Sequence, residues 1–144
     1  MQFMTSPILE SLPHLYHGFG TRSEEIPQGI VFPKQVHGDH VEILASPVPD
    51  SWHEPADAVI TTCPGLPIGI KTADCLPILM AEKAGKGVAA VHAGWKGMAL
   101  GILPKTIDRF RKQLGSDAEE IILAVGPGIG PCCLEVDDPV REFF

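Results

Sequence analysis

Cys75 and His92 stand at the two ends of a segment whose pattern predicts a β-hairpin. The apolar runs at 78–81 and 88–91 are separated by a polar turn centred near Lys83. Pairing these runs places Cys75 opposite His92, to within one or two residues of register. Opposed residues share one face of a sheet with Cβ atoms about 5 Å apart, and a thiolate and an imidazole at that separation can hold one zinc ion. The hairpin therefore predicts half of a metal site.

His37, in a loop ahead of a predicted strand, is the candidate third ligand. His40 and His53 compete with it, and the sequence alone leaves that choice open. The intervals of 38 and 17 residues from His37 to Cys75 and from Cys75 to His92 match no compact zinc-finger spacing. Three protein ligands leave the fourth position of zinc open, and water bound there becomes a nucleophile near neutral pH. The set therefore predicts a catalytic rather than a structural metal site.

Asp74 precedes Cys75 and is a candidate to orient His92 or to transfer a proton, although a turn-capping role is an equal alternative. Without a metal, the same residues suggest a cysteine hydrolase with Cys75 as nucleophile, His92 as base and Asp74 as orienting group. Taken singly, Cys75 is more often a packed thiol, and His37 or His92 a surface imidazole. Lys96 follows at a strand-to-helix junction, where it either binds phosphate or carboxylate or is simply solvated.

Composition limits the classes of protein that this chain can represent. With 144 residues we expect one domain, and the net charge of −7 makes nucleic acid an unsuitable partner. No apolar run approaches the length of a membrane span, and the first twenty residues do not resemble a signal peptide. We therefore expect a soluble, cytoplasmic protein with no membrane partner, in which all four cysteines, including the adjacent Cys132 and Cys133, are reduced thiols.

Several short strands and one clear helix must position these side chains. Alternating or continuous apolar residues predict strands at 14–19, 36–45, 57–62, 66–70 and 121–125 besides the hairpin. Apolar residues at helical spacing predict a helix that Pro104 either opens or kinks and that Gly115 ends; they are Leu103, Ile107, Phe110 and Leu114. This order predicts a mixed α/β (α+β) fold, a layered mixed β-sheet with flanking helices.

Five motifs in order resemble those of the YfiH family, also called the laccase-domain or "polyphenol oxidase" family. They occupy 34–38, 56–61, 71–77, 91–97 and 126–133, and residues 18–22 resemble the opening segment of the family. The resemblance implies a YfiH-like, cysteine-hydrolase-like fold. It also implies a single laccase domain over 1–144 that is shorter than usual between Arg22 and Lys34 and lacks the C-terminal segment of the family.

The resemblance implies a zinc ion, or alternatively copper, held by His37, Cys75 and His92. It implies a purine nucleoside phosphorylase acting on adenosine, guanosine, inosine and methylthioadenosine, with adenosine deaminase activity, and hence both transferase and hydrolase chemistry. The expected catalytic residues are Cys75, Asp74, His92 and Gln35, of which Gln35 would hydrogen-bond ribose or base. Available cations for phosphate are Arg22, Lys71 and Lys96. The expected partners are purine nucleoside and phosphate, and the expected state is a monomer or small homo-oligomer.

Three other functions remain in competition with nucleoside phosphorolysis. One is a peptidoglycan-editing amidase that acts on misloaded UDP-muramyl precursors in the cytoplasm, through a metal-activated water or Cys75. Another is a copper-dependent polyphenol oxidase, although the six histidines are scattered and contain no His-x-His pair for a multicopper centre. The third is a metal-binding domain without turnover.

Overall fold

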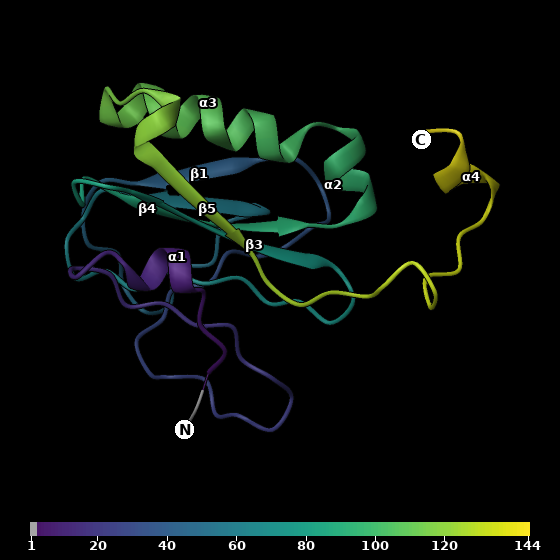
Figure 1. Ribbon diagram of the computed structural model, residues 1–144, viewed down its shortest axis with the longest axis horizontal. Helices are drawn as coiled ribbons and strands as arrows, with labels where there is room; N and C mark the ends of the chain where they lie inside the picture. Colours follow the sequence, from purple (N-terminus) through teal and green to yellow (C-terminus); the bar gives the residue numbers. More distant parts are fainter. Residues whose placement is uncertain (1–2) are drawn as a thin grey trace.

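A five-stranded mixed sheet forms the centre of the molecule in the computed structural model, which describes residues 3–144 (Figure 1). Its strand order is β1-β2-β4-β3-β5; β1 and β2 are parallel, and the other pairs are antiparallel. The strands are β1 Val41–Leu44, β2 Ala58–Thr61, β3 Leu76–Glu82, β4 Val88–Ala93 and β5 Ile121–Val125. The predicted mixed sheet with flanking helices is confirmed.

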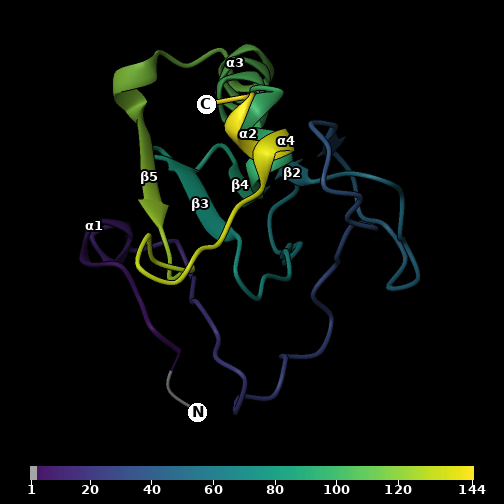
Figure 2. The same ribbon diagram turned by 90° about the vertical axis from the view of Figure 1, so that its right-hand side faces the viewer.

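Helices lie on both sides of this sheet. The helices α2 (Trp95–Ala99) and α3 (Ile102–Leu114) cover one face, and the short α1 (Pro7–Glu10) packs near β5 on the other (Figure 1). A 3₁₀ turn over Ala118–Glu120 leads into β5, and the segment beyond β5 carries α4 (Asp138–Arg141) back toward α2 (Figure 2). Within residues 3–144, no helix has the length and apolar character needed to cross a bilayer.

The apolar stripe of α3 packs against the sheet, as its spacing predicts. Phe110 is fully buried there, whereas its predicted partners Leu103, Ile107 and Leu114 are half-buried at the margin of the same core. Ile102 completes the buried contact with β2 and β4. Pro104 lies in the first turn, so it opens the helix without kinking it, and Gly115 caps the end with φ 62°.

The hairpin forms between β3 and β4, with a register close to the predicted one. Pro77, not Cys75, is opposite His92. The difference is two residues, and because side chains alternate along a strand, a shift of two leaves Cys75 on the expected face. Its turn is held by the buried carboxylate of Glu82, which accepts the backbone N–H groups of Ala84 at 2.9 Å and Lys86 at 3.1 Å.

Two predicted strands are wrong. The segments 14–19 and 66–70 make only single bridges, Phe19 with Met4 and Ile68 with Val31. In the second segment Pro67 has no N–H to donate to a ladder. Gly69 lies so close to Phe32 that a Cβ there would be 2.7 Å from its ring. Both segments instead cover the sheet face opposite α3, where Phe19 and Ile68 pack into apolar clusters.

Candidate metal centre

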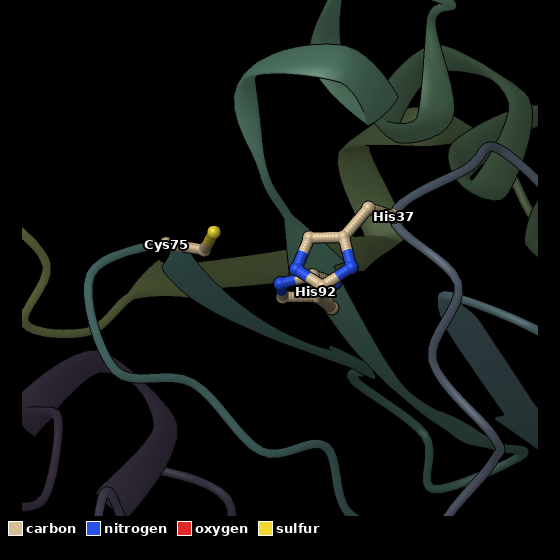
Figure 3. Close-up of side chains that lie close together, drawn as sticks. All are labelled: His37, Cys75 and His92. Carbon is tan, nitrogen blue, oxygen red and sulfur yellow. The ribbon is translucent and has the colours of Figure 1, made fainter.

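His37, Cys75 and His92 converge at one edge of the sheet. The atoms of these side chains that could bind a metal lie within 4.8 Å of one another. Figure 3 shows that they come from three elements: His92 from β4, Cys75 from the bend before β3, and His37 from the loop before β1. The three positions predicted as ligands are thus brought together, and the hairpin supplies two of them.

The two competing histidines have other partners. Nε2 of His40 lies 2.7 Å from the carboxylate of Glu42; the His40 side chain is exposed, and that of Glu42 is half-buried. Nδ1 of His53 lies 3.2 Å from the carbonyl oxygen of Phe32. Neither belongs to the group formed by His37, Cys75 and His92.

The imidazole of His92 is hydrogen-bonded to the carboxylate of Asp57. The sequence analysis did not identify Asp57 as a site residue. Nδ1 of His92 lies 2.7 Å from Oδ1 of Asp57, and the two side chains are 3% and 0% exposed. Donation of the Nδ1 proton to the carboxylate leaves Nε2 free as a metal ligand. The orienting role suggested for Asp74 is therefore filled by Asp57.

The same carboxylate holds the loop that carries His37. It accepts the backbone N–H groups of Val36 at 3.2 Å, His37 at 2.9 Å and Gly38 at 2.9 Å. His37 has φ 58°, a left-handed conformation that costs a residue with a Cβ roughly 1–2 kcal/mol. Burial alone would raise the pKa of Asp57, but the hydrogen bonds from His92 and the loop amides lower it below its ordinary value. Asp57 is thus a buried anion that fixes two prospective ligands.

Gly94 leaves a space between the three side chains. A Cβ at this position would lie 3.2 Å from Sγ of Cys75 and 3.7 Å from ring carbons of His37 and His92. One thiolate and two imidazoles suit zinc or copper, and three protein ligands leave a fourth position open. The residues therefore fit a single soft metal ion.

The electrostatic surroundings of Cys75 argue against a metal-free cysteine nucleophile. Burial raises the pKa of its thiol, and the nearby carboxylates of Asp74 and Asp57 raise it further. A thiol in this setting is protonated near neutral pH and is a weak nucleophile. A cation among the three side chains would reverse this tendency because a metal-bound thiol is deprotonated.

Gln35 and Lys71 are joined to each other by two hydrogen bonds. The Gln35 side chain accepts the backbone N–H of Lys71 and donates to its carbonyl, both at 2.7 Å. The ammonium of Lys71 lies 4.9 Å from the centre of the Phe32 ring. These residues line a shallow hollow of about 290 Å³ together with Pro33, Lys34 and His53.

The other predicted site residues are more dispersed. Lys96 is exposed on α2, two residues after Gly94, and Arg22 is exposed in the loop after Phe19; neither lines the hollow at Lys71. The Asp74 side chain is exposed, and its carbonyl oxygen accepts the backbone N–H of Ile129 at 2.9 Å.

Residues 19–144 match the family model described as multi-copper polyphenol oxidoreductase laccase. The chain belongs to this family. Among laccase-domain relatives, it is 40% identical to a purine nucleoside phosphorylase of Synechocystis sp., over 94% of this chain and 56% of that protein. It is 39% identical to the purine nucleoside phosphorylase YfiH of Escherichia coli, over 83% of this chain and 46% of the relative.

Solved structures of the laccase-domain family share this fold. The crystal structure of Bacillus licheniformis hypothetical protein YfiH has a TM-score of 0.74 and 32% identity, covering 80% of this chain and 46% of that one. YlmD from Geobacillus stearothermophilus has a TM-score of 0.71 and 30% identity, covering 81% and 46%. The expected YfiH-like fold is confirmed. The chain spans about half the length of the relatives it matches.

Proposed function

We propose that this chain acts as a zinc-dependent purine nucleoside phosphorylase on adenosine, guanosine, inosine and methylthioadenosine, with adenosine deaminase activity. The observation that carries the proposal is the convergence of His37, Cys75 and His92 in front of the buried Asp57 carboxylate. The names of the Synechocystis and E. coli relatives support the phosphorylase assignment.

His37, Cys75 and His92 would hold the ion, with zinc favoured and copper as the alternative. When bound, such an ion supplies a Lewis acid with an open coordination position. The contribution of the chain is to orient the ligands. Asp57 fixes the tautomer of His92 and the backbone of His37, so these ligands need little reorganisation.

Phosphorolysis requires phosphate to attack the anomeric carbon of the nucleoside while the bond to the purine nitrogen breaks. Positive charge develops on the sugar and negative charge on the leaving purine. Lys71, Lys96 and Arg22 are exposed cations available for phosphate. Gln35 fixes the backbone of Lys71 and keeps a second amide hydrogen for a ribose hydroxyl. Asp74, exposed and next to Cys75, is the candidate for proton transfer.

The competing functions make different demands on the site. A multicopper oxidase needs several copper centres, whereas residues 3–144 contain one group of three histidine and cysteine ligands, so polyphenol oxidation is disfavoured. An amidase that edits cell-wall precursors could use the same metal group with a different substrate pocket. A metal-binding domain without turnover needs only the three ligands.

The deciding experiment incubates the purified chain with adenosine and phosphate and identifies the products. Adenine with ribose 1-phosphate supports the phosphorylase, and inosine supports the deaminase. Serine released from a muramyl-serine nucleotide would instead support the amidase, and bound zinc without any product would support the non-catalytic alternative.

Metal analysis of variants tests the ligand assignment separately from turnover. Cys75→Ser and His92→Ala should lose stoichiometric zinc. His40→Ala should retain it, because His40 faces Glu42 outside the group. Unchanged zinc in Cys75→Ser and His92→Ala would contradict the assignment.

A further inference from the structure

Cys132 and Cys133 are adjacent thiols to which the proposed function gives no role. Both are exposed, and their Sγ atoms lie 3.3 Å apart. Their positions are set by a turn in which the backbone N–H groups of Cys133 and Leu134 both donate to the carbonyl oxygen of Gly130, at 3.0 and 3.1 Å. The turn therefore presents two thiols to solvent in mutual contact.

We propose that Cys132 and Cys133 form a redox-active vicinal dithiol, which low-molecular-weight disulfides oxidise reversibly to a disulfide. Two neighbouring thiols favour this reaction because the second thiol reaches the first without a bimolecular encounter. Cys63, by comparison, has its Sγ 3.9 Å from the carbonyl oxygen of Pro64 and no thiol beside it among the described residues. After reaction with a small disulfide, Cys63 can therefore only remain as a mixed disulfide.

The reaction proceeds by thiol–disulfide exchange and needs no further oxidant. The thiolate of Cys132 attacks one sulfur of the small disulfide, whose S–S bond breaks and releases one thiolate. Cys133 then loses its proton and attacks Sγ of Cys132, which releases the second small thiolate. Either sulfur can donate in the contact between them, so the exchange can equally begin at Cys133. Two protein thiols are oxidised, and one small disulfide is reduced to two thiols.

Chain geometry makes the product easy to reduce. Consecutive Cα atoms are about 3.8 Å apart across a trans peptide, below the range of about 4.4–6.8 Å usual for disulfides. A disulfide closed between neighbours is therefore strained and has a high reduction potential, which suits a reversible modification better than a structural cross-link.

The loop that carries the dithiol lies directly against the backbone around Cys75. The N–H of Gly126 donates to the carbonyl of Pro77 at 2.8 Å, and the N–H of Ile129 donates to that of Asp74 at 2.9 Å. At Gly128, an added Cβ would be 3.5 Å from the Cys75 carbonyl oxygen. Formation of the disulfide between Cys132 and Cys133 strains the adjacent turn at Gly130. It should therefore weaken the hydrogen bond from Ile129 to the Asp74 carbonyl. Any effect on metal binding rests on the proposed function, whereas the oxidation itself does not.

The first test equilibrates the full chain in buffers of reduced and oxidised glutathione, traps it with acid and maps tryptic peptides by mass spectrometry. We expect the peptide over 113–141 to lose the mass of two hydrogen atoms in oxidising buffer and to recover in reducing buffer. Cys133→Ser should stop at a glutathione adduct on Cys132. The natural Cys63 is the matched control and should carry only an adduct. A 113–141 peptide that stays reduced, or keeps adducts as Cys63 does, would overturn the proposal.

A second measurement tests the connection to Cys75. Hydrogen exchange of the Ile129 amide should be faster in the oxidised chain than in the reduced chain, and equal in both states for Cys133→Ser. Equal exchange in the two states of the natural chain would overturn the connection. Neither readout depends on turnover, so a failure here is distinguishable from a failure of the phosphorylase assignment.

Discussion

Nδ1 of His92 and Oδ1 of Asp57 are 2.7 Å apart, and both side chains are almost completely buried. Asp57 directly precedes β2. Because Ala58 of β2 pairs with Val91 of β4, Asp57 lies next to His92 on the neighbouring strand. Since its carboxylate also accepts three amides of the His37 loop, one residue couples a strand to a loop. The fold therefore holds the three prospective metal ligands together.

Replacing Asp57 with Asn should weaken zinc binding about 10- to 100-fold. A carboxylate that accepts the second ring N–H of a metal-binding histidine orients the imidazole and raises its basicity. Calorimetric titration against a chelator of known affinity measures the change. Asp108→Asn is the matched control: its carboxylate pairs with Lys112 on the exposed side of α3 and should leave the affinity unchanged. Equal affinities for natural chain and Asp57→Asn would refute the orienting role.

Gly94→Ala should lower zinc affinity by at least about tenfold, which corresponds to about 1.4 kcal/mol. The new methyl would lie 3.2 Å from Sγ of Cys75, in the space between the ligands. Gly94 has φ −75°, which alanine adopts freely. The free energy of unfolding of the metal-free chain should therefore change by less than about 1 kcal/mol. Gly130→Ala, whose methyl would meet only Sγ of Cys132 at 3.6 Å, should bind zinc normally.

His37→Gly should abolish stoichiometric zinc while leaving the metal-free chain unchanged or more stable by up to about 1 kcal/mol. Glycine removes the penalty of the positive φ at this position but adds backbone freedom to the unfolded chain. Urea unfolding of the metal-free natural chain and variant measures the difference in their free energies of unfolding. His40→Gly, at a position with ordinary φ, should instead destabilise by about 0.5–1 kcal/mol. Destabilisation of His37→Gly by more than 1 kcal/mol would exclude strain at His37.

Lys71→Met should raise the KM for phosphate about tenfold, because a charged donor to phosphate contributes roughly 1.5–3 kcal/mol. Methionine has a side chain of similar length without the charge, so it also removes the contact of the ammonium with the Phe32 ring. Lys83→Met is the control, since Lys83 lies at the hairpin turn and donates to the Glu119 carbonyl. An unchanged KM would move the phosphate site to Lys96 or Arg22.

The spacing of apolar residues was sufficient to predict the helix at Ile102–Leu114 and the hairpin. Both depend on contacts between residues that are near in sequence. The convergence of Cys75 and His92 followed from the hairpin alone. The choice of His37 over His40 and His53 required the β1–β2 pairing, which places the loop before β1 beside the start of β2.

Asp57 was missed because its role depends on a pairing distant in sequence. Its position before a run of β-formers resembled a strand start, and only the register of β2 with β4 brings it to His92. An acidic residue at the edge of an otherwise apolar strand was the available signal, since a buried carboxylate requires partners.

The Glu82 carboxylate stands at the far end of the hairpin from Cys75 and fixes the turn through two backbone amides. Slipping the strands by one residue would send the sulfur to the opposite side of the sheet, and slipping them by two would move it roughly 7 Å along its strand. The distance between sulfur and imidazole is thus determined by a turn at the opposite end of the hairpin. Replacement of Glu82, which removes both hydrogen bonds, should consequently appear as a defect in metal affinity.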